Sequence, residues 1–281
     1  MDERDLTSDL GFALHLADVA SAITMRWFGH RLPVELKADD TPVTEVDHAV
    51  ERAIREEIAS AFPGDGVLGE EEGLDAGTNG RLWLIDPVDG TKLFAEGIPL
   101  WTTLIGLRVD GAVAVGVADA PALGDRYHAT RGGGAWRDER RLRVSEVAGL
   151  SEAFVVHSGV EEWVAGERDD SLLRVASKAR RTRGLSDAWA QLLVAQGSAE
   201  LLMEHEPCFE WDWGATSVIV EEAGGRLSTF AGEPPSPGQD LLVTNGLVHD
   251  EALGVIAGEG ALSSAAAGAG SAPRPAHTRT S

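Results

Sequence analysis

Apolar residues recur every three or four positions in the N-terminal part of the chain, which is the spacing of amphipathic helices. One stripe runs through residues 8–29, with Ser8 as a candidate N-cap, and a second stripe follows Thr44. The stripes consist of Leu10, Ala13, Leu16, Ala17, Ala20, Ile23 and Trp27, and of Val46, Ala49, Val50, Ala53, Ile54 and Ile58. The pattern predicts two helices, and the turn-forming residues 63–66 end the second one.

Beyond this turn the pattern changes to short apolar runs that are separated by turns such as Asp110-Gly111. The first predicted strands cover residues 67–68, 82–85, 102–109, 112–118 and 127–130. After residue 150 strands and helices alternate. The predicted strands there are 154–157, 200–204 and 241–244, and the predicted helices are 187–196 and 211–223, the latter closed by Gly224-Gly225.

This order of elements predicts an α/β fold, and the length of 281 residues suits one large domain or two closely joined halves. We place the N-terminal half at residues 1–149 and the C-terminal half at 150–257. Residues 258–281 are mostly Ala, Gly, Ser and Pro, which bury too little apolar surface to offset their ordering entropy. The sequence therefore predicts a disordered tail.

Composition narrows the class of protein. The formal net charge is −22, from 46 acidic and 24 basic residues, and such a surface repels nucleic acids and anionic membranes. The N-terminus lacks the pattern of a signal peptide, and no apolar run has the length of a membrane span. The single cysteine, Cys208, excludes an internal disulfide and a Cys-based zinc cluster. We expect a cytoplasmic protein that binds neither nucleic acid nor membrane.

Acidic residues are concentrated in three segments that follow predicted strands or open a helix. They are residues 69–72 (GEEE), 86–91 (DPVDGT) and 211–212 (WD), the last beginning a helix that ends in 221–225 (EEAGG). A single Asp-Gly or Glu-Glu pair is usually only a turn or a helix cap. The whole hexapeptide after a strongly apolar strand, with the other two segments in order, makes that interpretation the weaker one.

The middle segment has the chemistry of a site for a hard cation. Asp86 and Asp89 are three residues apart in a predicted turn, so their carboxylates and the Val88 carbonyl can converge on one point. Ligation by oxygen alone suits magnesium. Gly90 lets the backbone approach a ligand, and Thr91 stands where the next helix begins, so free N–H groups there can receive phosphate oxygens. In so acidic a chain, metal is the natural source of positive charge for a phosphate ester.

With these residues the chain resembles the inositol monophosphatase family of metal-dependent phosphatases. The matching motifs are residues 41–47 (TPVTEVD), 69–71, 86–91 and 211–225, and the resemblance covers about residues 8–257. It implies an α-β-α-β-α layered sandwich, a small soluble phosphate monoester as the substrate, a homodimer, and two or three Mg²⁺ ions in each active site.

The resemblance also implies roles for individual residues. The first metal would be held by Glu70, Asp86 and the Val88 carbonyl. The second would be held by Asp86, Asp89 and Asp212.

The same motifs imply which groups act on water and phosphate. Glu70 and Thr91 would orient the attacking water, with Asp47 next to Thr91. Backbone amides of Gly90 and Thr91 would bind phosphate, and Lys37 matches a basic residue near the site.

Within the family the chain is most similar to the bacterial histidinol-phosphatase branch, which serves histidine biosynthesis. The stretches that carry this similarity are residues 36–47, 80–94, 97–105, 120–123 and 132–136. Leu93 stands where that branch has a polar Asn, and Trp213-Gly214 replaces smaller or apolar residues. These departures bear on substrate choice more than on the reaction.

Histidinol phosphate carries an amine, so its leaving group calls for a nearby carboxylate. Glu204 and Glu206 precede the acidic segment at 211–212, and Asp187 heads a helix, which makes these three, together with Lys37, the candidate substrate contacts. Exposed acids are the default in so acidic a chain, and His205 is expected to be a surface residue.

The best hypothesis from the sequence is a Mg²⁺-dependent phosphomonoesterase acting on histidinol phosphate. The alternatives within the same chemistry are an inositol-1-phosphate, sugar-phosphate or 3′-phosphonucleotide phosphatase, or a phosphatase of a specialised pathway. A non-catalytic metal-binding regulator is disfavoured, because the proposed ligands and the water-orienting residues are all present.

Overall fold

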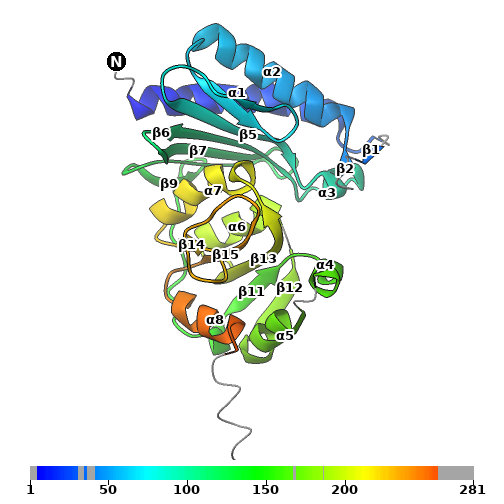
Figure 1. Ribbon diagram of the computed structural model, residues 1–281, viewed down its shortest axis with the longest axis vertical. Coiled ribbons are helices and arrows are strands. Elements are labelled where there is room, and N and C mark those ends of the chain that lie inside the picture. Colours follow the sequence, from blue (N-terminus) through cyan, green and yellow to red (C-terminus); the bar gives the residue numbers. More distant parts are fainter. Residues whose placement is uncertain (1–4, 31–34, 37–41, 167–168, 186, 259–281) are drawn as a thin grey trace, which may run out of the picture.

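The computed structural model describes residues 5–30, 35–36, 42–166, 169–185 and 187–258, and its elements stack in alternating helical and sheet layers (Figure 1). Of the predicted tail at 258–281, residues 259–281 lie outside the described residues. The outermost helical layer consists of α1 (Leu6–Trp27) and α2 (Glu45–Ala61), with a two-stranded ribbon of β1 (Glu35–Leu36) and β2 (Pro42–Val43) beside it. The α-β-α-β-α arrangement predicted from the sequence is confirmed.

The first sheet has eight strands in the order β10-β9-β8-β7-β6-β5-β3-β4. These are β3 (Gly66–Gly69), β4 (Gly73–Asp75), β5 (Arg81–Asp89), β6 (Thr102–Val109), β7 (Ala112–Ala120), β8 (Asp125–Thr130), β9 (Gly134–Arg137) and β10 (Arg140–Arg141). All neighbours are antiparallel except β3 and β5, which run parallel. The short helix α3 (Thr91–Ala95) follows β5 directly.

The second sheet has five strands in the order β12-β11-β13-β15-β14. These are β11 (Phe154–His157), β12 (Arg181–Gly184), β13 (Leu201–Cys208), β14 (Arg226–Ser228) and β15 (Gln239–Thr244). Its helices are α4 (Val160–Ala165), α5 (Asp169–Lys178), α6 (Asp187–Ala195), α7 (Glu210–Glu222) and α8 (His249–Ile256), after a 3₁₀ turn at Leu150–Glu152. The boundary between halves at residues 149–150 stays a prediction.

Three apolar clusters fill the spaces between the layers. One joins α1 and α2 to the first sheet, a second surrounds α6 and α7 between the two sheets, and a third lies between the second sheet and α4, α5 and α8. None of the described helices combines the length and apolarity that a membrane crossing requires.

Helix α7 approaches the first sheet closely because both sides of the interface contain a glycine at a point of close contact. A Cβ at Gly116 of β7 would lie 2.1 Å from the carbonyl oxygen of Ala215, and one at Gly214 would lie 2.5 Å from Leu84 Cδ1. Gly214, which departs from the pattern of the family branch, is therefore explained by packing. The close approach brings the first turn of α7 to the end of β5.

Several details of the predicted helices are corrected. The N-cap of α1 is Asp5, whose carboxylate accepts the N–H of Thr7 at 3.2 Å, and not Ser8. Trp27 is 42% exposed and Ala49 is exposed, although both were assigned to inward stripes. Buried acids also occupy inward positions. One of them is Asp9, which forms an ion pair with Arg81, and a pattern of apolar residues does not predict that an acid is buried.

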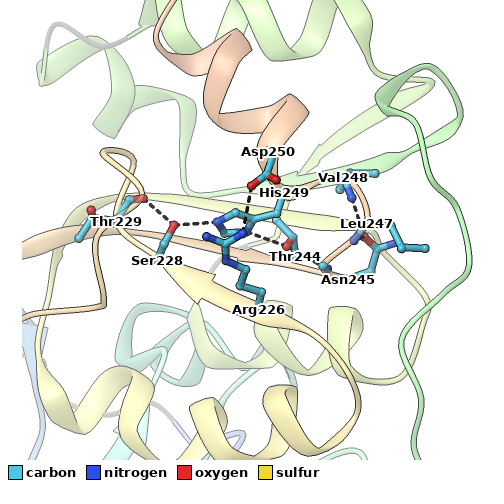
Figure 2. Close-up of polar contacts among 10 residues, drawn as sticks. Arg226, Ser228, Thr229, Thr244, Asn245, Leu247, Val248, His249 and Asp250 are labelled. Carbon is cyan, nitrogen blue, oxygen red and sulfur yellow. Dashed lines mark hydrogen bonds and ion pairs between the residues drawn. The ribbon is translucent and has the colours of Figure 1, made fainter.

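A buried histidine ties the end of β15 to α8 and β14 (Figure 2). The Nδ1 atom of His249 lies 2.9 Å from Thr244 Oγ1, and its Nε2 atom lies 3.1 Å from Ser228 Oγ. Ser228 already donates its proton to the carbonyl of Thr229, so it accepts from Nε2–H, and Thr244 donates to Nδ1. Both ring nitrogens of a neutral imidazole are thereby satisfied.

Burial, followed by the nearby Arg226, lowers the pKa of His249 to about 4, while Asp250 acts in the opposite direction. Between about pH 6.5 and pH 4 the unfolded chain binds a proton at this position that the folded protein excludes. The stabilising contribution of His249 is therefore fully present above pH 6.5 and is lost as the pH falls toward 4. Its size is on the order of 3 kcal/mol.

We expect His249→Gln to flatten this part of the pH dependence, since glutamine does not titrate. Urea unfolding near pH 7 and near pH 4.5 measures the free energy of unfolding of both proteins. The drop on acidification should be about 2–3 kcal/mol smaller in the variant. His15→Gln, at an exposed position on α1, is the control. Equal drops in wild type and His249→Gln would contradict the assignment.

Candidate active site

Acidic residues from both halves of the chain line one cavity of about 460 Å³. Glu70 comes from the turn between β3 and β4, Asp86 and Asp89 from the end of β5, and Asp212 from the first turn of α7. The remaining residues that were predicted for the site and line this cavity are Val88, Gly90, Thr91, Asp187 and Glu204. The tertiary structure therefore brings together the segments that are distant along the sequence.

A local irregularity in β5 shapes the central acidic segment. The prediction of a strand ending at Ile85, followed by a turn, is wrong in detail, because β5 continues to Asp89. Asp86 pairs with Leu104 and Asp89 with Thr102, so β5 has one residue more than β6 between these pairs. Such an extra residue is a bulge, which changes the direction of side chains at a strand end. Asp86 and Asp89 are both buried there.

Thr91 begins α3 after a glycine in the left-handed conformation, with φ of 85° at Gly90. The Thr91 hydroxyl lies 3.0 Å from the carbonyl oxygen of Val88 and 3.3 Å from Asp47 Oδ1. Asp47 is held by the capping box of α2, in which its Oδ2 accepts the N–H and the hydroxyl of Thr44 at 2.8 and 2.6 Å. The predicted neighbourhood of Asp47 and Thr91 is therefore present.

Crowding of negative charge dominates the electrostatics. Burial raises the pKa of Asp86 well above its usual value, and the carboxylates of Glu70, Asp89, Asp212 and Asp47 raise it further. The pKa of Asp89, the other acid of the bulge, is raised in the same way. Burial is again the largest cause that raises its pKa, followed by nearby carboxylates, while two hydrogen bonds act in the opposite direction.

One direct observation supports the fit of these residues to a magnesium site. The Oδ1 atom of Asp86 is buried, and no hydrogen-bond partner for it is found among the described residues. A buried carboxylate oxygen is stable when it is protonated or faces a cation, and a set of oxygen donors selects a hard cation such as Mg²⁺. The structure describes no group of three acidic, His or Cys side chains already arranged as a metal cage.

Two of the proposed ligands meanwhile accept hydrogen bonds from their surroundings. Asp212 Oδ2 accepts the N–H of Phe209 at 2.6 Å, which caps α7. Asp89 Oδ2 accepts the N–H of Ala188 at 2.9 Å and the hydroxyl of Thr102 at 3.1 Å. Because these donors come from β6 and from the start of α6, the carboxylate of Asp89 joins the two halves of the chain.

The predicted substrate contacts are placed unequally. Asp187 opens α6 and Glu204 lies in β13, and both line the cavity. Lys37 and the side chain of Glu206 lie outside the described residues. Leu93 lines the cavity, whereas Trp213 packs against the cluster between the sheets. Of the two departures from the family branch, Leu93 is thus the one at the site.

The sequence analysis did not predict that residues of α4 line the cavity. Glu161 and Glu162 line the cavity, and Glu162 forms an ion pair of 3.2 Å with Lys92 of α3, across the two halves. A second cavity of about 690 Å³ adjoins the first and shares Glu161, Glu162 and Pro207 with it. An adjacent pair of glutamates in a chain with 46 acidic residues carries no signal that could have selected it.

The model of the inositol monophosphatase family matches residues 5–263, which is most of the chain. The chain belongs to the inositol monophosphatase family. A histidinol-phosphatase of Mycobacterium tuberculosis is 41% identical over 251 residues, which cover 87% of this chain and 96% of the relative. A histidinol-phosphatase of Streptomyces coelicolor is 41% identical over 262 residues, with coverage of 90% and 98%.

Solved structures agree with this assignment. The IMPase of Thermotoga maritima has a TM-score of 0.82 and 31% identity, over 90% of this chain and 98% of that one. The inositol monophosphatase of Anabaena has a TM-score of 0.80 and 26% identity, over 93% and 100%. The predictions of family, fold and reaction class are confirmed. This member of the family is a phosphoric monoester hydrolase, and the family depends on metal, typically Mg²⁺.

Because the carboxylates of the site repel one another, we expect Asp86→Asn to stabilise the metal-free protein and to reduce its stabilisation by Mg²⁺. Asp86→Asn removes a buried charge without changing size, so in the presence of a chelator it should raise the free energy of unfolding by about 0.5–2 kcal/mol. Added Mg²⁺ should stabilise the wild type strongly and the variant weakly. Thermal unfolding with EDTA and with Mg²⁺ measures both effects. A variant that is less stable in EDTA would contradict the repulsion argument.

Proposed function

We propose that this protein hydrolyses histidinol phosphate to histidinol and phosphate, using at least two Mg²⁺ ions held by the carboxylates of the cavity. The observation that carries the metal proposal is that Glu70, Asp86, Asp89 and Asp212 line one cavity, in which burial and the neighbouring carboxylates raise the pKa of Asp86. The substrate proposal is supported by the two histidinol-phosphatases that are 41% identical over nearly the whole chain.

The ligand roles are those that the family motifs imply, and the residues concerned line the cavity. Glu70, Asp86 and the carbonyl of Val88 would hold one ion, and Asp86, Asp89 and Asp212 the other. Magnesium bound there would acidify a water molecule and neutralise charge on the oxygens of the ester. A third ion is compatible with the number of acids that line the cavity.

The protein's own groups would orient the reactants. The Thr91 hydroxyl, held near Asp47, and the carboxylate of Glu70 would align the attacking water with phosphorus. Backbone N–H groups of Gly90 and Thr91 would bind the phosphate oxygens. The water oxygen forms the new bond to phosphorus and the ester P–O bond breaks on the opposite side. One proton of the water ends on the departing alkoxide, so that the products are the alcohol and inorganic phosphate.

The walls around the leaving group favour a cation. Asp187, Glu204, Glu161 and Glu162 also line the cavity, and the adjoining cavity, which Glu161 and Glu162 line too, gives room for a leaving group. The ammonium and imidazole groups of histidinol would be attracted there. The second phosphate of a sugar bisphosphate or of a bisphosphorylated nucleotide would be repelled.

Inositol 1-phosphate is the second candidate substrate, because its leaving group is uncharged and the similar solved structures include inositol monophosphatases. Sugar phosphates, 3′-phosphonucleotides and a phosphate of a specialised pathway complete the alternatives. The homodimer, the cytoplasmic location and the roles of Lys37 and Glu206 stay predictions.

The reaction is tested by Asp89→Asn, which changes the charge of one proposed ligand but not its size. We expect kcat to fall at least about 100-fold, because charge at the reacting phosphate is no longer balanced. Phosphate release at saturating Mg²⁺ measures the loss, and circular dichroism checks the fold. Asp110→Asn, in the exposed turn between β6 and β7, is the matched control. An Asp89→Asn enzyme with wild-type kcat would refute the ligand assignment.

The substrate is tested by kcat/KM for histidinol phosphate, inositol 1-phosphate, fructose 1,6-bisphosphate and a 3′,5′-bisphosphorylated nucleoside. We expect histidinol phosphate to exceed each of the others by about 100-fold or more, which corresponds to about 2.7 kcal/mol of transition-state binding. The preference should weaken at high salt, where charge attraction is screened. A higher kcat/KM for any other member of the panel would overturn the substrate proposal.

A further inference from the structure

One buried glutamate lies beneath the acidic turn and takes no direct part in the proposed chemistry. Glu51, in the middle of α2, has none of its surface exposed, although glutamate is rarely buried without partners. Its Oε2 atom accepts the N–H of Glu71 at 2.8 Å, and its Oε1 atom accepts the N–H of Glu72 at 3.0 Å. Arg55 donates its Nε–H to Oε1 at 2.9 Å.

The turn that Glu51 supports is the segment that presents Glu70 to the cavity. It connects β3 to β4, and the N–H of Glu70 bonds to the carbonyl of Ile85 in β5 at 3.2 Å. The carboxylate of Glu51 fits beneath this turn only because Gly69 has no side chain. A Cβ at Gly69 would lie 2.1 Å from Glu51 Oε1.

These contacts are strong for hydrogen bonds of a protein interior. The acceptor is a charged carboxylate, and charge-assisted bonds are about twice as strong as neutral ones. Arg55, whose side chain is 16% exposed, supplies the opposite charge and also donates to the carbonyl of Gly73 at 2.5 Å. Glu51 thus binds the N–H groups of Glu71 and Glu72, and Arg55 binds the carbonyl of Gly73 at the far end of the turn.

We propose that Glu51 is a positioning residue, which fixes the turn of residues 69–73 so that the carboxylate of Glu70 is held ready for the metal. The inference rests on the proposed function, because it requires Glu70 to be a ligand. Groups that orient metal ligands without touching the metal typically change metal affinity 10- to 100-fold when they are replaced.

The test variant is Glu51→Gln, which preserves length and volume. The single amide oxygen can accept one of the two N–H groups of the turn, and its NH₂ opposes the other. We expect the Kd of Mn²⁺, a spectroscopic substitute for Mg²⁺, to rise about 10- to 100-fold in a titration followed by electron paramagnetic resonance. The Mg²⁺ concentration for half-maximal activity should rise in parallel, while KM for the phosphate ester at saturating Mg²⁺ stays within about twofold.

Glu57→Gln is the matched control on the same helix. Glu57 is 45% exposed and bonds to His15 at 3.1 Å. It should leave the Mn²⁺ affinity unchanged.

A second readout does not depend on metal or on activity. Hydrogen–deuterium exchange of the metal-free protein should show slow exchange at the amides of Glu71 and Glu72, and faster exchange in Glu51→Gln. Gly69→Ala, which forces the carboxylate and the turn apart, should produce the same two changes. If Glu51→Gln does not fold, hydrogen–deuterium exchange of the wild-type protein still tests the proposal. Rapid exchange of the amides of Glu71 and Glu72 would overturn it.

The remaining outcomes separate this inference from the proposed function. Faster exchange without a change in Mn²⁺ affinity overturns the positioning role, provided that Asp89→Asn weakens Mn²⁺ binding. If Asp89→Asn also leaves Mn²⁺ binding unchanged, the metal site itself is wrong, and the positioning proposal fails with it. A lower unfolding temperature with unchanged exchange and unchanged Mn²⁺ affinity would show that Glu51 is only structural.

Discussion

The structure depends on a concentration of negative charge that the fold itself creates. Asp86 and Asp89 are buried at the end of a core strand, and Glu70 and Asp212 face the same cavity from other elements. Because burial and repulsion by nearby carboxylates both raise the pKa of Asp86 and Asp89, the ionised form of these two acids is costly until a cation joins them. A cation bound there would favour the ionised form of both acids, so the proposed metal site depends on the scaffold that holds them in place.

That scaffold is made of small structural devices at some distance from the reaction. The bulge in β5 changes the direction of two carboxylates, and a capping box on α2 fixes Asp47 beside Thr91. Gly116 allows α7 to approach the sheet, so that Asp212 reaches the end of β5. These devices place individual polar groups, and rigid elements supply the precision that loops alone would lack.

Chemistry and specificity are divided between different parts of the molecule. The first sheet, α3 and the start of α7 carry the groups proposed for metal and phosphate, whereas β13, α4 and α6 carry the acids proposed to face the leaving group. Such a division permits changes in substrate while the hydrolytic centre stays intact, which agrees with a family whose similar members bear the names of histidinol-phosphatases and inositol monophosphatases. The ion pair between Lys92 and Glu162 joins these two parts at the cavity.

The sequence alone determined the elements with strong local signals and the identity of the acidic motifs. The strand at 154–157 and the helix that follows Thr44 were predicted with correct limits, since period and capping are local properties. Tertiary structure alone decided which acids are buried. Glu51 is buried because the amides of a turn twenty residues away come to its carboxylate. Glu161 lines the cavity because α4 packs against β13, and no pattern along the chain records such long-range contacts.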